Sequence, residues 1–128
     1  MKLLLDTHVL LWWLADGREL TMRARRMIVN PGNEIWVSAA SVWEIATKVR
    51  IGKLGMALSE VENIESICLE EKFRLLPIQF NHAARAGLLP GEHRDPFDRM
   101  LAAQAILNNL TVITKDTELG SLGARVYW

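Results

Sequence analysis

Short apolar runs alternate with longer amphipathic segments along the whole chain. The short runs are rich in aliphatic or β-branched residues, which predicts buried strands. They are Lys2–Leu5, Glu34–Val37, Arg74–Ile78, Leu110–Thr114 and Ala124–Trp128. Pro77 cannot donate a backbone hydrogen bond, so the Arg74–Ile78 strand is expected at an edge of the sheet.

The segments between these runs have the 3.6-residue spacing of helices. They are Thr7–Ala15, Thr21–Val29, Ser38–Ile51, a helix from Ser59, Asn81–Leu88, a helix from Pro96 and a turn at Glu118–Leu122. Ser59 and Glu62 have the spacing of a capping box, which predicts a helix start at Ser59. Strands that alternate with helices predict an α/β domain with a mainly parallel sheet, and 1–128 is the length of one domain.

Composition narrows the class of protein only a little. The chain has 15 Lys and Arg against 15 Asp and Glu, so net charge indicates no particular partner. The lone Cys68 excludes an internal disulfide, and its helical spacing with Ile64 is typical of a buried thiol. Asp6 and His8 interrupt the first apolar run, and no segment is long enough to cross a bilayer. We therefore expect a cytoplasmic protein without a membrane partner.

The segment His93–Ala105, with the sequence HRDPFDRMLAAQA, places two carboxylates at the start of an apolar helix. Asp95 fits the N-cap, Pro96 fits the first helical position, and Asp98 falls in the first turn. Helix initiation alone would explain both acids.

Three further acids occupy comparable places elsewhere. Asp6 and Asp116 each follow a predicted strand, where an acid can simply cap a helix or form a turn. Glu44 lies one turn into its helix, where it could form a capping box with Ser41 or an ion pair with Lys48.

Taken together, Asp6, Glu44, Asp98 and Asp116 can meet at the carboxyl edge of one parallel sheet. Two unit charges about 5 Å apart repel by roughly 3 kcal/mol at an effective dielectric of 20, so stability does not explain such a cluster. Mg²⁺ or Mn²⁺, which prefer carboxylate oxygens, would relieve the repulsion.

Other kinds of site lack support in the sequence. His8, His82 and His93 are isolated, so no zinc spacing exists, and each is expected to be structural or on the surface. The glycines form no phosphate-binding loop, and no serine lies in a GxSxG turn.

The motifs LLLDTHVLLWWL, VSAASVWEIATKVRIGKL, HRDPFDRMLAAQA and TVITKD occur in the order and spacing of PIN-domain proteins. From Met1 to Trp128 the chain most closely resembles the VapC-type ribonuclease toxins of bacterial toxin–antitoxin pairs. The resemblance implies a PIN-like, Rossmann-like domain of three layers and a metal-dependent endoribonuclease. It maps the family's acids onto Asp6, Glu44, Asp98 and Asp116, and leaves Asp95 as an auxiliary acid or only a cap.

A mechanism consistent with this resemblance assigns further roles. Asp6 and Asp98 would be the main ligands of Mg²⁺ or Mn²⁺, and Glu44 and Asp116 would complete the metal shell or orient the nucleophile. Supporting hydrogen bonds are expected from Thr7, Ser38 and Thr114, whereas Arg99 is either a phosphate contact or an exposed helix residue.

The family also implies an RNA substrate, a cognate antitoxin and a homodimer. The chain has a surplus of large apolar residues, most of which core packing would use; exposed ones would suit a dimer or a partner helix. They are Leu10, Leu11, Trp12, Trp13 and Trp43.

Three alternatives remain open at this point. A haloacid-dehalogenase-type phosphatase would need a second acid where His8 stands, and a receiver-like module would need an acidic pair near Asp6. A PIN fold that only binds RNA or protein would be expected to lack one of the acids.

Overall fold

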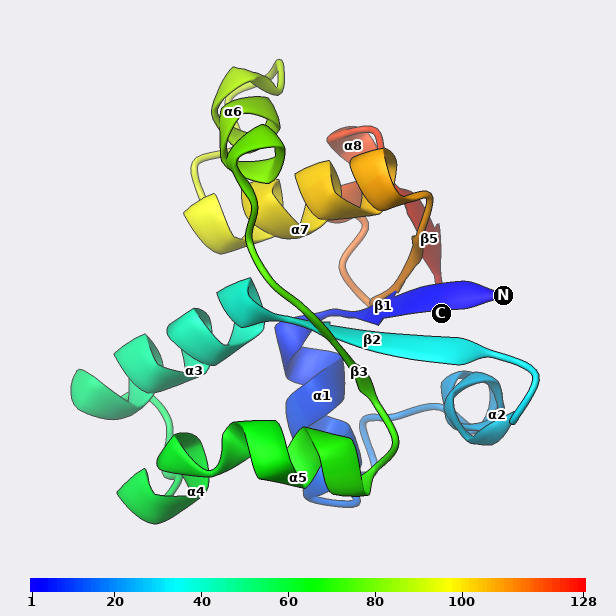
Figure 1. Ribbon diagram of the computed structural model, residues 1–128, viewed down its shortest axis with the longest axis vertical. Coiled ribbons are helices and arrows are strands. Elements are labelled where there is room, and N and C mark those ends of the chain that lie inside the picture. Colours follow the sequence, from blue (N-terminus) through cyan, green and yellow to red (C-terminus); the bar gives the residue numbers. More distant parts are fainter.

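The computed structural model describes residues 1–128 and is built on five parallel strands in the order β3-β2-β1-β4-β5 (Figure 1). The strands are β1 (Lys2–Leu5), β2 (Glu34–Ser38), β3 (Arg74–Leu76), β4 (Thr111–Ile113) and β5 (Arg125–Tyr127). In the register of the central strand, Leu4 lies opposite Trp36 and Val112. The predicted α/β class is confirmed, and the sheet is parallel throughout.

Helices cover both faces of this sheet (Figure 1). They are α1 (Thr7–Leu14), α2 (Met22–Val29), α3 (Ala39–Arg50), α4 (Leu58–Glu62), α5 (Ile64–Glu70), α6 (Phe80–Leu88), α7 (Pro96–Asn108) and α8 (Glu118–Ser121). Successive β1 side chains point to opposite faces, so Leu3 and Leu5 join the core with α1, α2 and α5, while Leu4 joins the core with α6, α7 and α8. The result is three layers, and no helix is long and apolar enough to cross a membrane.

Two predicted elements differ from the structure by more than one terminal residue. Instead of one helix from Ser59, the chain forms α4 and α5, which meet at Asn63, and Ala57 rather than Ser59 is the N-cap. The Asn63 side chain donates to the Ser59 carbonyl at 2.7 Å, and this local bond competes with continuous helix. Strand β3 ends at Leu76, just before Pro77, and lies at the sheet edge as expected.

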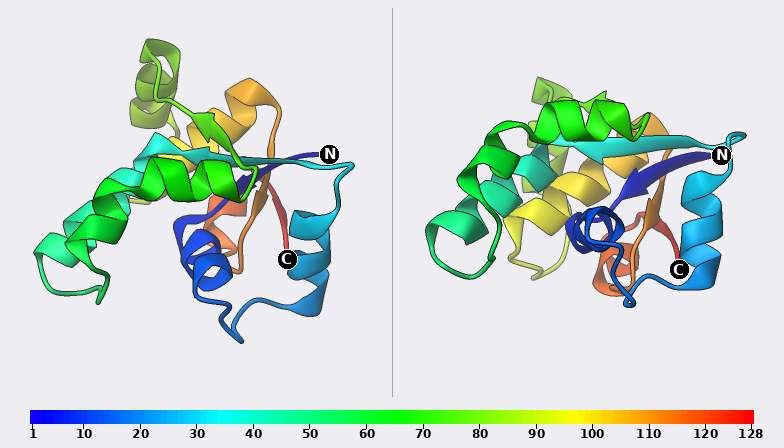
Figure 2. Two further views of the ribbon diagram at one scale, coloured as in Figure 1. Left: turned by 60° about the horizontal axis from the view of Figure 1, so that its bottom comes forward. Right: turned by 90° about the horizontal axis from the view of Figure 1, so that it is seen from below.

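The helix α3 runs away from the sheet, and α4 and α5 bring the chain back beside it (Figure 2). Cys68 of α5 is 1 % exposed, in agreement with the buried thiol expected from its spacing. Burial raises the pKa of this thiol to about 11, so Cys68 is an inert core residue.

Candidate active site

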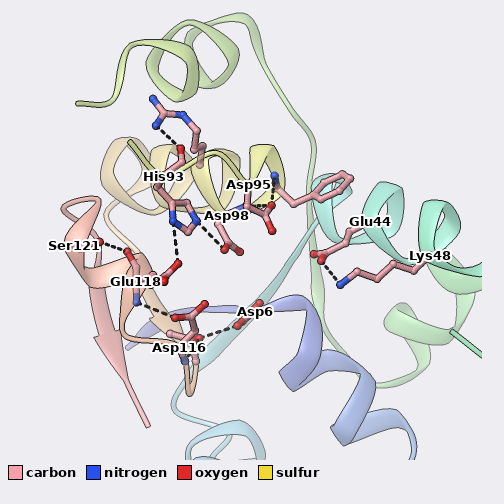
Figure 3. A network of polar contacts seen from close by, with 12 residues as sticks. Asp6, Glu44, Lys48, His93, Asp95, Asp98, Asp116, Glu118 and Ser121 are labelled. Carbon is pink, nitrogen blue, oxygen red and sulfur yellow. Dashed lines mark hydrogen bonds and ion pairs between the residues drawn. The ribbon is translucent and has the colours of Figure 1, made fainter. Parts of the chain in front are cut away.

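Asp6 and Asp116 lie beyond the carboxyl ends of the neighbouring strands β1 and β4 (Figure 3). The backbone N–H of Asp6 donates to the Ile113 carbonyl at 3.1 Å and extends the pairing of these strands. The Thr114 hydroxyl donates to Asp6 Oδ2 at 2.7 Å and accepts the Asp116 N–H at 2.9 Å. Thr114 therefore orients Asp6 and connects it to Asp116.

The two acids use their carboxylates differently. Asp6 is at the N-cap position of α1, but its side chain makes no capping bond. Asp116 Oδ1 accepts the Glu118 N–H at 2.9 Å, which is the turn-forming contact considered for it above. The carboxylate of Asp6 is therefore not used to begin a helix, whereas that of Asp116 helps to form the turn before α8.

Glu44 reaches the same edge from the second turn of α3 and is only 4 % exposed. The N-cap of α3 is Ser38, whose hydroxyl accepts the Ala40 N–H at 2.9 Å, so the predicted capping box with Ser41 is not formed. The predicted ion pair is present, with 2.6 Å between Glu44 Oε2 and Lys48 Nζ (Figure 3).

Asp98 is held at the start of α7 by its neighbours. Asp95 is the N-cap, and its Oδ1 accepts the N–H groups of Phe97 at 2.9 Å and Asp98 at 3.2 Å. This leaves the Asp98 carboxylate free to contact His93, with 3.0 Å between Asp98 Oδ2 and His93 Nε2. The other ring nitrogen of His93 lies 2.9 Å from Glu118 Oε2 (Figure 3).

His93 was expected to be isolated, and that expectation is wrong. Its ring bridges Asp98 and Glu118, residues that no helical or strand periodicity relates to one another. His82, by contrast, is buried and accepts the Gln79 N–H at the start of α6, as expected of a structural histidine.

Thr7 and Ser38, proposed as supports for the acids, are buried, and their hydroxyls contact other groups. The backbone of Thr7 does hydrogen-bond to Asp6 and lowers the pKa of that carboxyl. The Thr7 hydroxyl donates to Ser41 Oγ at 3.0 Å, where it ties α1 to α3. The Ser38 hydroxyl donates to Gln104 Oε1 at 2.5 Å and ties β2 to α7. Both hydroxyls hold the elements that carry the acids rather than the carboxylates themselves.

Arg99 is neither a free phosphate contact nor an exposed helix residue. Its guanidinium donates to backbone carbonyls at the end of α6 and in the following loop, those of Ala86, Gly87, Leu89 and His93. Arg99 thereby fixes the loop that presents His93 to Asp98.

The acids influence one another electrostatically. Burial raises the pKa of Asp6 above its ordinary value; the Thr114 hydrogen bond and the nearby His8 oppose this, and the charge of Glu44 adds to it. Burial also raises the pKa of Asp98 to about 6, with further increases from the charges of Asp95 and Asp6 and a decrease from His93. Asp6 is thus coupled to both Glu44 and Asp98.

The donor chemistry of these residues fits a hard divalent cation, because all four are carboxylates and two of them are costly to ionise where they lie. No three His, Cys, Asp or Glu side chains are grouped closely enough to hold a metal ion as they stand. Lys48 and His93 pair with Glu44 and Asp98, so a cation would compete with them for these carboxylates.

A Rossmann-like α/β domain with carboxylates at the carboxyl edge of a parallel sheet is the class defined by this fold and site. A family model described as the PIN domain matches residues 3–124. The chain belongs to the PIN-domain family. It is 34 % identical to Ribonuclease VapC22 of Mycobacterium tuberculosis over 119 aligned residues. The aligned region covers 92 % of this chain and 89 % of that protein.

Solved structures with the same fold include chains of two VapBC complexes. A chain of VapBC2 from Rickettsia felis, bound to a promoter DNA fragment, has a TM-score of 0.72 and 15 % identity, covering 99 % of this chain and 98 % of that one. A chain of DNA-bound VapBC from Salmonella typhimurium has a TM-score of 0.71 and 17 % identity, covering 99 % and 97 %. At these identities the likeness establishes the fold.

Proposed function

We propose that this protein is a metal-dependent endoribonuclease and the toxin of a toxin–antitoxin pair. The observation that carries the proposal is that Asp6, Glu44, Asp98 and Asp116 lie along one edge of a PIN-domain sheet, although they are not yet grouped as a metal site. The 34 % identity to a protein named as a ribonuclease supports RNA as the substrate.

Asp6 and Asp98, with Glu44 and Asp116, would hold Mg²⁺ or Mn²⁺. A bound ion would supply Lewis-acid chemistry for hydrolysis of the scissile phosphodiester. The chain's own residues set up that chemistry. Thr114 orients Asp6, Arg99 and His93 position Asp98, and the burial of Asp6 and Glu44 keeps their carboxylates in a medium of low dielectric constant.

The partners follow from the same family membership. A solved structure with this fold, from Klebsiella pneumoniae, is a toxin–antitoxin complex, which supports a cognate antitoxin for this chain. Trp43 of α3 is 55 % exposed. Its ring packs edge-on against that of Phe97, the residue before Asp98, with 4.8 Å between the ring centroids. We propose that an antitoxin covers apolar surface of this kind near the site, and that the toxin forms a homodimer in the cytoplasm.

Cleavage of a mixed, end-labelled RNA pool tests the proposal. We expect cleavage with Mg²⁺ or Mn²⁺, none with a chelator, and a loss of about 100-fold or more in Asp98→Asn, because the substitution removes a charged ligand. Asp16→Asn is the matched control. Asp16 is an exposed acid beyond the opposite end of α1 from Asp6, with a positive φ of 51°, a conformation that asparagine tolerates.

Activity retained in Asp98→Asn would place the site elsewhere. Metal binding without cleavage of any RNA would favour the non-catalytic binding module over the nuclease.

A further inference from the structure

Two hollows at the surface share one wall. The first, the acidic hollow, has a volume of about 360 Å³ and is lined by Asp6, His8, Trp12, Lys115 and Asp116. The second, the apolar hollow, has a volume of about 620 Å³ and is also lined by His8 and Trp12. His8 and Trp12 therefore form the boundary between the candidate catalytic acids and a neighbouring apolar surface.

This boundary is aromatic. His8 and Trp12 lie one turn apart on α1, with their ring centroids 5.9 Å apart and their planes tilted by 42°. Trp128 packs edge-on against Trp12 from another side, with 5.9 Å between the ring centroids. His8 is exposed and Trp12 is half-buried, so aromatic surface is open to solvent beside the acids.

Positive charge lies on both sides of the aromatic pair. Lys115 lines the acidic hollow, and Lys53 lines the apolar hollow, where Leu11 and Leu54 supply the apolar wall. Lys48 also lines the apolar hollow, but it is paired with Glu44. Both Lys53 and Lys115 are exposed and lie in none of the ion pairs of the structure.

An aromatic platform between two lysines is the combination that single-stranded nucleic acid uses, because bases stack on aromatic rings and phosphates contact cations. We propose that His8 and Trp12 form a subsite that stacks a nucleobase of single-stranded RNA beside the cleavage position, with Lys53 and Lys115 contacting the flanking phosphates. The proposal rests on the nuclease function proposed above. Stacking accepts every base, so this subsite positions the strand without reading its sequence.

The next residue of the same helix offers a matched control. Trp13 Nε1 donates to Glu71 Oε2 at 3.1 Å, and its ring packs 6.1 Å from Phe73. Trp13 lines neither the acidic nor the apolar hollow. Replacing Trp13 changes the same side chain on the same helix without touching the proposed subsite.

The test measures binding by fluorescence anisotropy with fluorescein-labelled, mixed-sequence single-stranded RNA. Every protein carries Asp98→Asn, so that the RNA survives in Mn²⁺. We expect Trp12→Leu to raise Kd about fivefold or more, and Trp12→Phe and Trp13→Leu to stay within about twofold. Near-ultraviolet circular dichroism checks that each variant is folded.

A second measurement begins with the protein that retains Trp12. A single abasic nucleotide is moved along the RNA, and we expect it to weaken binding at one position in the protein with Trp12. In Trp12→Leu that position should no longer differ from the others, because the stacking partner is gone.

Trp12→Leu binding as tightly as Trp13→Leu would overturn the subsite, as would abasic RNA that shows no position of weaker binding. In either case, cleavage by the protein with Asp98 intact would leave the nuclease function standing. If that protein neither binds nor cleaves RNA, both proposals fail. If Trp12→Leu binds RNA as tightly as the protein with Trp12 but no longer binds an antitoxin peptide, the aromatic pair belongs to a protein-binding surface and the subsite is overturned.

Discussion

Ionising the Asp98 carboxyl costs more free energy in the folded protein than in the unfolded chain. Its side chain is 15 % exposed, and burial together with the charges of Asp95 and Asp6 raises its pKa from 3.8 to about 6. Between these two pH values the folded state binds more protons than the unfolded state, so the stability of the metal-free protein falls as pH rises through this range. A residue kept ionised at this cost is typical of a functional site.

We therefore predict that Asp98→Asn stabilises the metal-free protein at pH 7 to 8 by about 1 kcal/mol, after allowance for solvent screening and the lost attraction to the helix dipole. The gain should shrink as pH falls through the range from about 6 to 3.8 and disappear only well below it, where Asp98 is protonated in both states. Urea unfolding above and below this range measures the effect. A gain of equal size on both sides of the range would contradict the electrostatic explanation.

At the scale of an element, the first turn of α7 combines helix initiation with site chemistry. Asp95 accepts hydrogen bonds from two of the free backbone N–H groups, and Pro96 has no N–H that needs an acceptor. The Asp98 side chain is therefore not needed for capping and contacts His93. Asp95 is therefore used as a cap, whether or not its charge also contributes to catalysis.

Two substitutions of Asp95 separate these roles. Asp95→Asn keeps a capping oxygen and removes the charge, so we predict unchanged stability within about 0.5 kcal/mol and cleavage within about threefold of the original protein. Asp95→Ala should lower stability by about 1 kcal/mol, because the two N–H groups lose their acceptor. Thermal unfolding and RNA cleavage measure both. A loss of activity in Asp95→Asn comparable with that of Asp98→Asn would make Asp95 an acid of the site.

At the scale of the whole molecule, strand order brings the acids together. Because β1 lies between β2 and β4, Asp6 at its end is flanked by α3 on one side and by the loop after β4 on the other. Helix α7, which packs on the opposite face of the sheet from α1, adds Asp98 at the same edge (Figure 3). Asp6, Glu44 and Asp98 thus share one electrostatic environment, although they come from three separate parts of the chain.

A cation bound by this shared environment should stabilise the fold by mass action. At ten times its Kd, Mn²⁺ is predicted to add about 1.4 kcal/mol, which is a rise of a few degrees in Tm. The rise should be retained in Asp16→Asn and strongly reduced in Asp98→Asn. Calorimetric titration and thermal unfolding measure the effect. The absence of both a heat of binding and a rise in Tm at millimolar Mn²⁺ would contradict the metal site.

Features that depend on near neighbours in the chain can be read from the sequence. Hydrophobic spacing predicts the strands, most helices and the parallel α/β class. Local spacing also predicts the start of α7 at Asp95 and Pro96 and the Glu44–Lys48 ion pair, and both are present. Where two local signals competed, as at Ser59 and Asn63, the sequence favoured the wrong one.

Contacts between side chains of different layers depend on how the elements pack in three dimensions. Nothing in local spacing relates His93 to Glu118, or Arg99 to the carbonyls after α6. Ser38 and Thr7 were assigned to the acids from their position in the chain, but their hydroxyls contact Gln104 and Ser41. These contacts are directional, and their partners are selected by how helices and strands pack, which periodicity along the chain does not encode.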